Sequence, residues 1–203
     1  MVTEKSKLFF QRITELCSGN PRIAILMSGK GSNAKAILEQ RFRYSNLDFI
    51  ALMTNKAISN AKLLADAFNL LYVLVEDQLV ASREEFFSMM SEELRCLNVQ
   101  MLIYAGFMKI TPASFLAEFP GINMHPADLT ICGENGQPKY VGMNAVSDVI
   151  RDRQLSTAST LHVVEEVVDF GIPIAISSRM PLSGTGTESP KEVHNAMKIN
   201  CEH

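Results

Sequence analysis

Short, almost entirely apolar runs alternate with segments of helical periodicity over the first 125 residues of the chain. The runs that predict strands are residues 22–28, 47–55, 71–75, 100–107 and 121–125. The segments that predict helices between them are residues 32–42, 59–69, 82–97 and 111–119. Strands joined by crossover helices pair in parallel, and strands without polar alternation are covered on both faces. The pattern therefore predicts an α/β fold with a doubly wound, mostly parallel sheet.

Three of the predicted helices carry recognisable start signals. Ser82 precedes one helix and Glu85 stands three residues later, which is the capping-box spacing. Thr111 is the expected cap of a second helix, with Pro112 at its first position. Ser59 or Asn60 is the expected cap of a third.

The pattern changes after Tyr140. A helix is predicted over about residues 143–153, and residues 156–182 read as two strands joined by a turn, which we expect to be antiparallel and to extend the sheet. A last helix begins near Pro190. Because there is no repeat or linker, we expect residues 1–203 to form a single domain, with residues 1–20 as an N-terminal helical extension.

Composition and charge narrow the class of protein. The chain has 203 residues, of which 47% are hydrophobic and 20% are charged. Its net charge of −3 gives no reason to expect a nucleic-acid partner. No apolar run reaches the length of a membrane span. The four cysteines show neither the pairing of a zinc site nor that of a disulfide framework, so we expect no metal and a cytoplasmic protein.

The loop SGKGSNA, between the first strand and its helix, is a candidate anion site. Gly29 and Gly31 permit positive φ and close approach of the backbone, and the amides at a helix start attract anions. The Gly-x-Gly-x-x-Ala spacing also matches a dinucleotide fingerprint, but that motif needs an acidic residue after the second strand, where the chain reads Asn55-Lys56. A single phosphate therefore fits better, and a tight glycine turn that binds nothing is the alternative.

The fifth strand ends in Asn123-Met124-His125, which places an amide and an imidazole on the same side of a strand. In open parallel sheets, ligands bind at the carboxyl ends of the strands. An amide and an imidazole suit a carbonyl oxygen that becomes an oxyanion, and such a site often includes a carboxylate. Asp169, at a turn before Gly171, is the best candidate for that third group.

The chain resembles the folate-dependent formyltransferases, in particular the phosphoribosylglycinamide formyltransferases of purine biosynthesis. The matching segments occur in the family's order over about residues 22–203. They are RIAILMSGKGSNAKAIL, TNKA, SREEFF, AGFMKITPASF, INMHP, LHVVEEVVDFGIPI and a terminal EH. The resemblance implies a formyltransferase-like variant of the Rossmann fold and a formyl transfer from 10-formyltetrahydrofolate to the primary amine of glycinamide ribonucleotide.

The resemblance also implies roles for individual residues. Asn123 and His125 would stabilise the tetrahedral intermediate, and Asp169 would assist proton transfer through an ordered water. The substrate phosphate would bind at Gly29, Lys30, Gly31, Ser32 and Asn33, the substrate ribose at Glu202, and the folate at Arg83, Met108, Lys109 and Ile110. His162 falls at a family position near the reacting centre, although a buried structural histidine is the alternative.

The chain departs from the family directly after His125-Pro126. The family continues Ser-Leu-Leu-Pro and reaches an aromatic-x-Gly within a few residues, whereas this chain reads ADLTICGENGQPK before Tyr140-x-Gly142. The extra residues either reshape the pocket or form a surface insertion.

We therefore expect an enzyme with small-molecule substrates, as a monomer or homodimer, that binds neither nucleic acid nor membrane. A formyltetrahydrofolate hydrolase, or a formyltransferase for another amine, is the alternative within the enzymes. A non-catalytic protein that binds folate or nucleotide is the alternative of another class.

Overall fold

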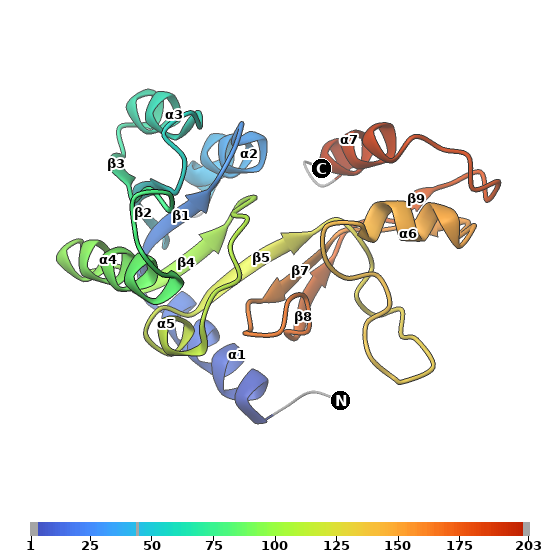
Figure 1. The fold of residues 1–203 in the computed structure, drawn as a ribbon, viewed down its shortest axis with the longest axis horizontal. Helices are drawn as coiled ribbons and strands as arrows, with labels where there is room; N and C mark the ends of the chain where they lie inside the picture. The colour runs from blue at the N-terminus through green and yellow to red at the C-terminus, as the bar shows by residue number, and fades with distance from the viewer. Residues whose placement is uncertain (1–3, 44, 201–203) are drawn as a thin grey trace. The chain divides into compact units, whose positions relative to one another are not determined.

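The computed structural model describes residues 4–43 and 45–200 (Figure 1). The chain divides into two compact units, one formed by Leu8–Ile122 and the other by the residues from Asn123 onward together with the first residues of the chain. The expectation of a single domain stays a prediction.

The unit Leu8–Ile122 contains four parallel strands in the order β3-β2-β1-β4. Their bounds are β1 (Arg22–Met27), β2 (Asp48–Thr54), β3 (Leu71–Leu74) and β4 (Met101–Tyr104). Strand β5 (Gly121–His125) begins beside β4, where the N–H of Leu102 donates to the carbonyl of Pro120. The parallel pairing predicted from the apolar runs is confirmed.

Helix α1 (Glu4–Cys17) precedes β1, and helices connect the strands, as their periodicity predicts. The connecting helices are α2 (Ser32–Gln40) with the short 3-10 helix η1 (Arg41–Arg43), α3 (Ala61–Phe68), α4 (Arg83–Cys96) and α5 (Ala113–Glu118). Ile25 and Met27 pack against α2 and α3, while Ala24 and Leu26, which point to the other face, are equally buried. Figure 1 shows α2 and α3 toward one side of these strands and α4 and α5 toward the other. The sheet of this unit is therefore covered on both faces, as a doubly wound fold requires.

The predicted helix starts are partly correct. The Ser82 hydroxyl accepts the N–H of Glu85 at 3.0 Å, which confirms the cap of α4. The assignment at α5 was wrong by one residue, because Pro112 is extended and is itself the N-cap, its carbonyl accepting the N–H of Phe115. Asn60 is the N-cap residue of α3, but its side chain donates to the carbonyl of Lys30 and caps nothing.

The second unit contains the end of β5, from Asn123 to His125. Strand β7 (Thr160–Val163) lies beside β5. Strand β7 pairs antiparallel with β8 (Pro173–Ile176), which confirms the antiparallel C-terminal pair. A separate two-stranded sheet of β6 (Ser156–Thr157) and β9 (Met180–Pro181) was not predicted. Helices α6 (Ala145–Arg151) and α7 (Pro190–Asn200) pack through four apolar side chains: Val146, Ile150, Val193 and Met197.

Candidate functional site

A buried carboxylate lies between two buried histidines in the second unit. His125 ends β5, His162 lies on β7, and Asp169 lies in the connection from β7 to β8. The Nδ1 atom of His125 is 3.1 Å from Oδ2 of Asp169, and Nε2 of His162 is 3.4 Å from its Oδ1. All three residues are at most 7% exposed. The fold thus brings His125 and Asp169 into contact, as expected from the sequence.

The surroundings of Asp169 favour its ionised form. Burial alone would raise the pKa of this carboxyl group, but hydrogen bonds from His125 and His162 and the N–H of Gly142 outweigh burial and hold the pKa far below its usual value. The N–H of Gly142 donates to Oδ2 at 2.7 Å. Asp169 is therefore a fixed negative charge between the two rings.

His125 faces an acceptor at each ring nitrogen. Its Nε2 atom is 2.8 Å from the carbonyl oxygen of Tyr140, opposite the contact of Nδ1 with Asp169. A neutral imidazole carries one N–H and donates to one of these acceptors, whereas the imidazolium donates to both. The geometry thus suits a histidine that acts as a hydrogen-bond donor.

Asn123 contacts the second histidine. Its Nδ2 atom is 3.1 Å from Nε2 of His162, whose Nδ1 donates to the carbonyl of Val163 at 2.8 Å. In this tautomer the neutral ring of His162 accepts from the amide, while a protonated ring can donate to Asp169 instead. Asn123, His125, His162 and Asp169 therefore form one hydrogen-bonded cluster.

Two backbone features hold the carboxylate in place. Asp169 has a φ of 60°, in the left-handed region that aspartate tolerates better than most residues. At Gly171, a Cβ atom would lie 1.7 Å from the carbonyl oxygen of Val163, so no other residue fits there without displacing the backbone. That carbonyl also accepts from His162.

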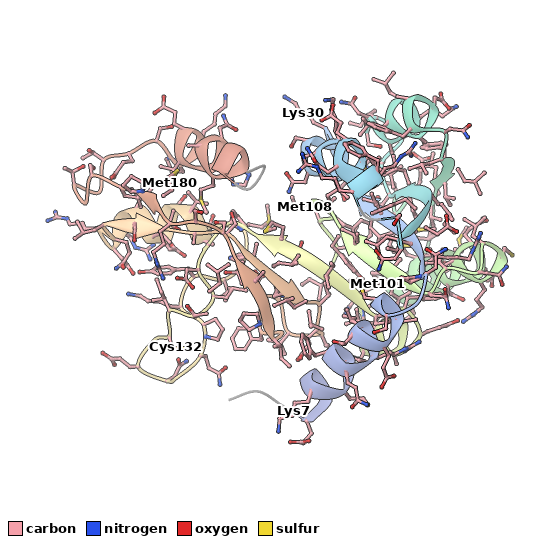
Figure 2. The ribbon with its side chains drawn as sticks, turned by 180° about the vertical axis from the view of Figure 1, so that it is seen from behind. Lys7, Lys30, Met101, Met108, Cys132 and Met180 are labelled. Carbon is pink, nitrogen blue, oxygen red and sulfur yellow. The ribbon has the colours of Figure 1, made fainter. Side chains whose placement is uncertain are left out.

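The glycine loop predicted to bind phosphate lies in the unit Leu8–Ile122. Gly31 has a φ of 71° and precedes α2, whose first turn has no side-chain cap. A Cβ on Gly31 would lie 2.6 Å from side-chain atoms of both Met27 and Leu64. Lys30 is exposed on this loop (Figure 2). The amides of Ser32 and Asn33 begin the helix, which is the arrangement that favours an anion.

A polar network that the sequence did not reveal links the ends of the parallel strands. The side chain of Asp77, two residues after Val75, is 8% exposed and contacts Lys109, Lys56 and the amide of Asn55. Burial alone would raise the pKa of Asp77, but the hydrogen bond from Lys109, with Asn55 and Lys56, lowers it. Its place just after a predicted strand was the signal that could have identified it.

The residues predicted to bind folate lie near this network. Lys109 pairs with Asp77, and the N–H of Met108 donates to the Ser28 hydroxyl at 3.0 Å. The guanidinium of Arg83 donates to the carbonyl of Ile110 at 3.0 Å. Met108 and Ile110 are 66% and 56% exposed, and Met108 is labelled in Figure 2.

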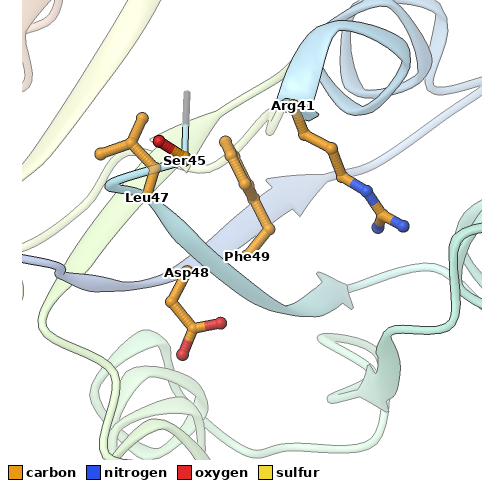
Figure 3. Close-up of a pocket in the computed structure, with 5 residues that line it drawn as sticks. All are labelled: Arg41, Ser45, Leu47, Asp48 and Phe49. Carbon is orange, nitrogen blue, oxygen red and sulfur yellow. The ribbon is translucent and has the colours of Figure 1, made fainter. Parts of the chain in front are cut away.

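The remaining features are the position of Glu202, the absence of a candidate metal site or membrane-spanning helix among the described residues, and a surface hollow. Glu202 lies outside the described residues. Among the residues that the structure describes, no group of three or more histidine, cysteine or acidic residues could hold a metal ion, and no helix is long and apolar enough to cross a membrane. A hollow of about 260 Å³ at the amino end of β2 is lined by Arg41, Ser45, Leu47, Asp48 and Phe49 (Figure 3).

Comparison with known proteins gives a consistent result. A trifunctional purine biosynthetic protein adenosine-3 from Chironomus tentans is 30% identical over 80% of this chain, but the chain spans only 12% of that relative. The phosphoribosylglycinamide formyltransferase of Bacillus subtilis is 29% identical, with 76% of each chain covered. The structure of glycinamide ribonucleotide transformylase 1 from Symbiobacterium toebii has the same fold, with a TM-score of 0.79 at 22% identity over 90% of this chain and 82% of that one. Residues 21–198 match the formyl transferase family, and the chain therefore belongs to that family.

Proposed function

We propose that this protein transfers a formyl group from 10-formyltetrahydrofolate to the primary amine of glycinamide ribonucleotide, a step of purine biosynthesis. The observation that carries the proposal is the buried cluster of Asn123, His125, His162 and Asp169 in a chain of the formyl transferase family. A relative covered over 76% of its length is named for this activity. The substrates are small molecules, and we expect a cytoplasmic monomer or homodimer.

The chemistry follows from the hydrogen-bonding groups of the cluster. The acceptor amine attacks the formyl carbon, forming a C–N bond, and the carbonyl oxygen becomes an oxyanion. The amide of Asn123 and the Nε2–H of His125 donate to that oxygen, as an oxyanion site requires. The bond from the formyl carbon to the folate nitrogen then breaks, and the amine proton passes to that nitrogen with the help of Asp169 through a water.

The arrangement of His125 suits this role. Asp169 holds the Nδ1–H at 3.1 Å, and the carbonyl of Tyr140 lies 2.8 Å from Nε2. The substrate oxygen would lie beside the Tyr140 carbonyl and share the Nε2–H with it. His162 would position Asn123 and share the charge of Asp169.

The substrate-binding residues are proposed from the family pattern and the local geometry. The phosphate of the acceptor would bind the amides of Gly29–Asn33, with Lys30 as an added cation, and Glu202 would contact the ribose. The folate would lie against Arg83, Met108, Lys109 and Ile110. The uncapped start of α2 and the exposed side chains of Met108 and Ile110 support these assignments.

The decisive experiment is incubation with 10-formyltetrahydrofolate, with and without glycinamide ribonucleotide. Tetrahydrofolate that forms only with the acceptor supports transfer. Product without acceptor indicates a formyltetrahydrofolate hydrolase, and product only with a different amine indicates another acceptor. Absence of product in both reactions, with folate still bound, leaves a non-catalytic binding protein.

The residues are tested by substitution in the same assay. His125→Ala should lower kcat by about 10²-fold or more, because it removes a donor to the oxyanion, while folate binding persists. Turnover of His125→Ala close to that of the unchanged protein would contradict the assignment.

A further inference from the structure

The residues after β5, in which the chain departs from its family, are buried at both ends and exposed in the middle. We call residues 126–142 the post-β5 segment. Ala127, Asp128 and Tyr140 are at most 1% exposed. Between them a short turn, closed by the bridge of Cys132 with Pro138, is exposed at its tip. Cys132, where the turn closes, is labelled in Figure 2. The segment is therefore packed into the second unit at its two ends, and only its middle is exposed.

The first end of the post-β5 segment is fixed by the Asp128 carboxylate, which has partners at both of its oxygens. Oδ1 of Asp128 accepts both the N–H and the hydroxyl of Thr130, and Oδ2 pairs with the guanidinium of Arg179. The hydroxyl of Thr160 donates to the carbonyl of Ala127 at 2.8 Å and accepts the N–H of Leu129 at 3.0 Å. These contacts fix the chain within three residues of His125.

The second end meets the catalytic cluster through the backbone alone. The carbonyl of Tyr140 lies 2.8 Å from Nε2 of His125, and the N–H of Gly142 donates to Asp169 at 2.7 Å. The Tyr140 ring is 1% exposed and packs with Ala127 and Val149, so the peptide that carries this carbonyl is held in place.

We propose that the post-β5 segment is the element that positions the His125–Asp169 pair. Its positioning residues are Gly142, within the segment, and Arg179, which pairs with Asp128 at its first end. The inference rests on the proposed function for its catalytic consequence, but the geometry that it concerns exists independently of turnover. The Tyr140 carbonyl orients the ring and the Gly142 N–H orients the carboxylate. The Asp128–Arg179 ion pair anchors the opposite end of the same segment.

Two glycines of the segment form a matched pair for the test. Gly142 and Gly136 have φ values of 73° and 72°, and a Cβ on either would meet no atom within 4 Å. Alanine therefore introduces the same backbone strain at both, but only Gly142 contacts the catalytic pair. Gly142→Ala should lower kcat by about tenfold with little change in the KM for folate, while Gly136→Ala should leave both near the values of the unchanged protein.

A second readout does not require turnover. The NMR signal of the Asp169 carboxyl carbon, which is assigned by comparison with Asp169→Asn, reports the ionisation of that group. The groups that face this carboxyl are His125, His162 and the N–H of Gly142. In Gly142→Ala the carboxyl should titrate at higher pH than in the unchanged protein, because the variant weakens a hydrogen bond to the carboxylate. In Gly136→Ala the titration should be unchanged. Equal titration in both variants overturns the proposal, even if the protein transfers formyl groups.

The anchor is tested with two arginines of similar exposure. The side chains of Arg179 and Arg95 are 52% and 57% exposed. Their partners differ, because Asp128, which pairs with Arg179, is 1% exposed, whereas Glu118, which pairs with Arg95, is 36% exposed. Arg179→Gln should lower kcat and raise the pKa of the Asp169 carboxyl group. Arg179→Lys should restore part of both, and Arg95→Gln should change neither. If Arg179→Gln folds and retains the Asp169 titration of the unchanged protein, the anchor plays no part in positioning.

The two proposals fail in different ways. If no formyl transfer is found with any acceptor, the proposed function fails, whereas a titration that shifts only in Gly142→Ala and Arg179→Gln still supports the positioning role. If transfer is found but the titrations do not shift, the positioning role alone fails.

Discussion

At the scale of single residues, three properties of Asp169 bear on stability. It is 7% exposed, it has a positive φ, and its carboxyl group is ionised between two imidazole rings. A buried charge of this kind persists because hydrogen bonds satisfy both of its oxygens. Its contribution to stability therefore depends on pH.

The sign of that dependence is fixed by the lowered pKa of Asp169. A carboxyl group whose pKa is lowered in the folded protein stabilises the fold at pH values above its unfolded-state pKa of 3.8. That stabilisation is lost as the pH falls toward the folded-state pKa. Asp169→Asn, which tolerates the same φ, should lower the free energy of unfolding by roughly 2 kcal/mol at pH 7. Urea unfolding of both proteins should show this difference shrinking below about pH 4. A difference that stays constant to pH 3 would show that the Asp169 charge does not contribute.

Single residues also show how far the sequence predicts the candidate site. Asn123, His125 and Asp169 stand out because side chains at strand ends and turns follow a positional rule. Asp77 escaped notice although the same rule applies to it, because its lysine partner Lys109 is 32 positions later in the sequence. The carbonyl of Tyr140 and the N–H of Gly142 could not be predicted, since every residue carries such groups.

At the scale of elements, strands that are buried on both faces were the easiest to predict. After Arg22, strand β1 is an unbroken apolar run, because helices cover both of its faces. Strands β6 and β9 have two residues each, too few to show any periodicity, and the sequence did not indicate them. Their pairing depends on contacts distant in the sequence, such as the N–H of Leu182 donating to the carbonyl of Leu155.

The β7–β8 connection provides a prediction at this scale. At Gly171 an added Cβ would lie 1.7 Å from the Val163 carbonyl, whereas at Gly133 the nearest atom would be 3.4 Å away. Gly171→Ala should therefore destabilise the protein by roughly 3 kcal/mol and Gly133→Ala by less than about 1 kcal/mol. Thermal or urea unfolding of the two variants measures the contrast. Similar stabilities would show that the connection moves aside without cost.

At the scale of the whole molecule, net charge and local geometry act in opposite directions on an anion. The net charge of −3 gives no general attraction for phosphate, so any stabilisation by phosphate must come from a specific site. The glycine loop before α2 is the site expected to provide it, because the helix start has no side-chain cap. A ligand that binds only the folded protein stabilises it by about 2.7 kcal/mol at a concentration of 100 Kd.

Thermal unfolding in increasing inorganic phosphate tests this site with a matched pair of variants. Gly31 and Gly184 have φ values of 71° and 70°, and at each an added Cβ would lie 2.6 Å from a leucine side chain, but only Gly31 belongs to the loop. Both alanine variants should unfold at a lower temperature than the unchanged protein. Phosphate should raise the midpoint for the unchanged protein and for Gly184→Ala, and by much less for Gly31→Ala, because the variant displaces the amides that hold the anion. An equal rise in all three proteins would place the phosphate elsewhere and remove the main support for a phosphorylated acceptor.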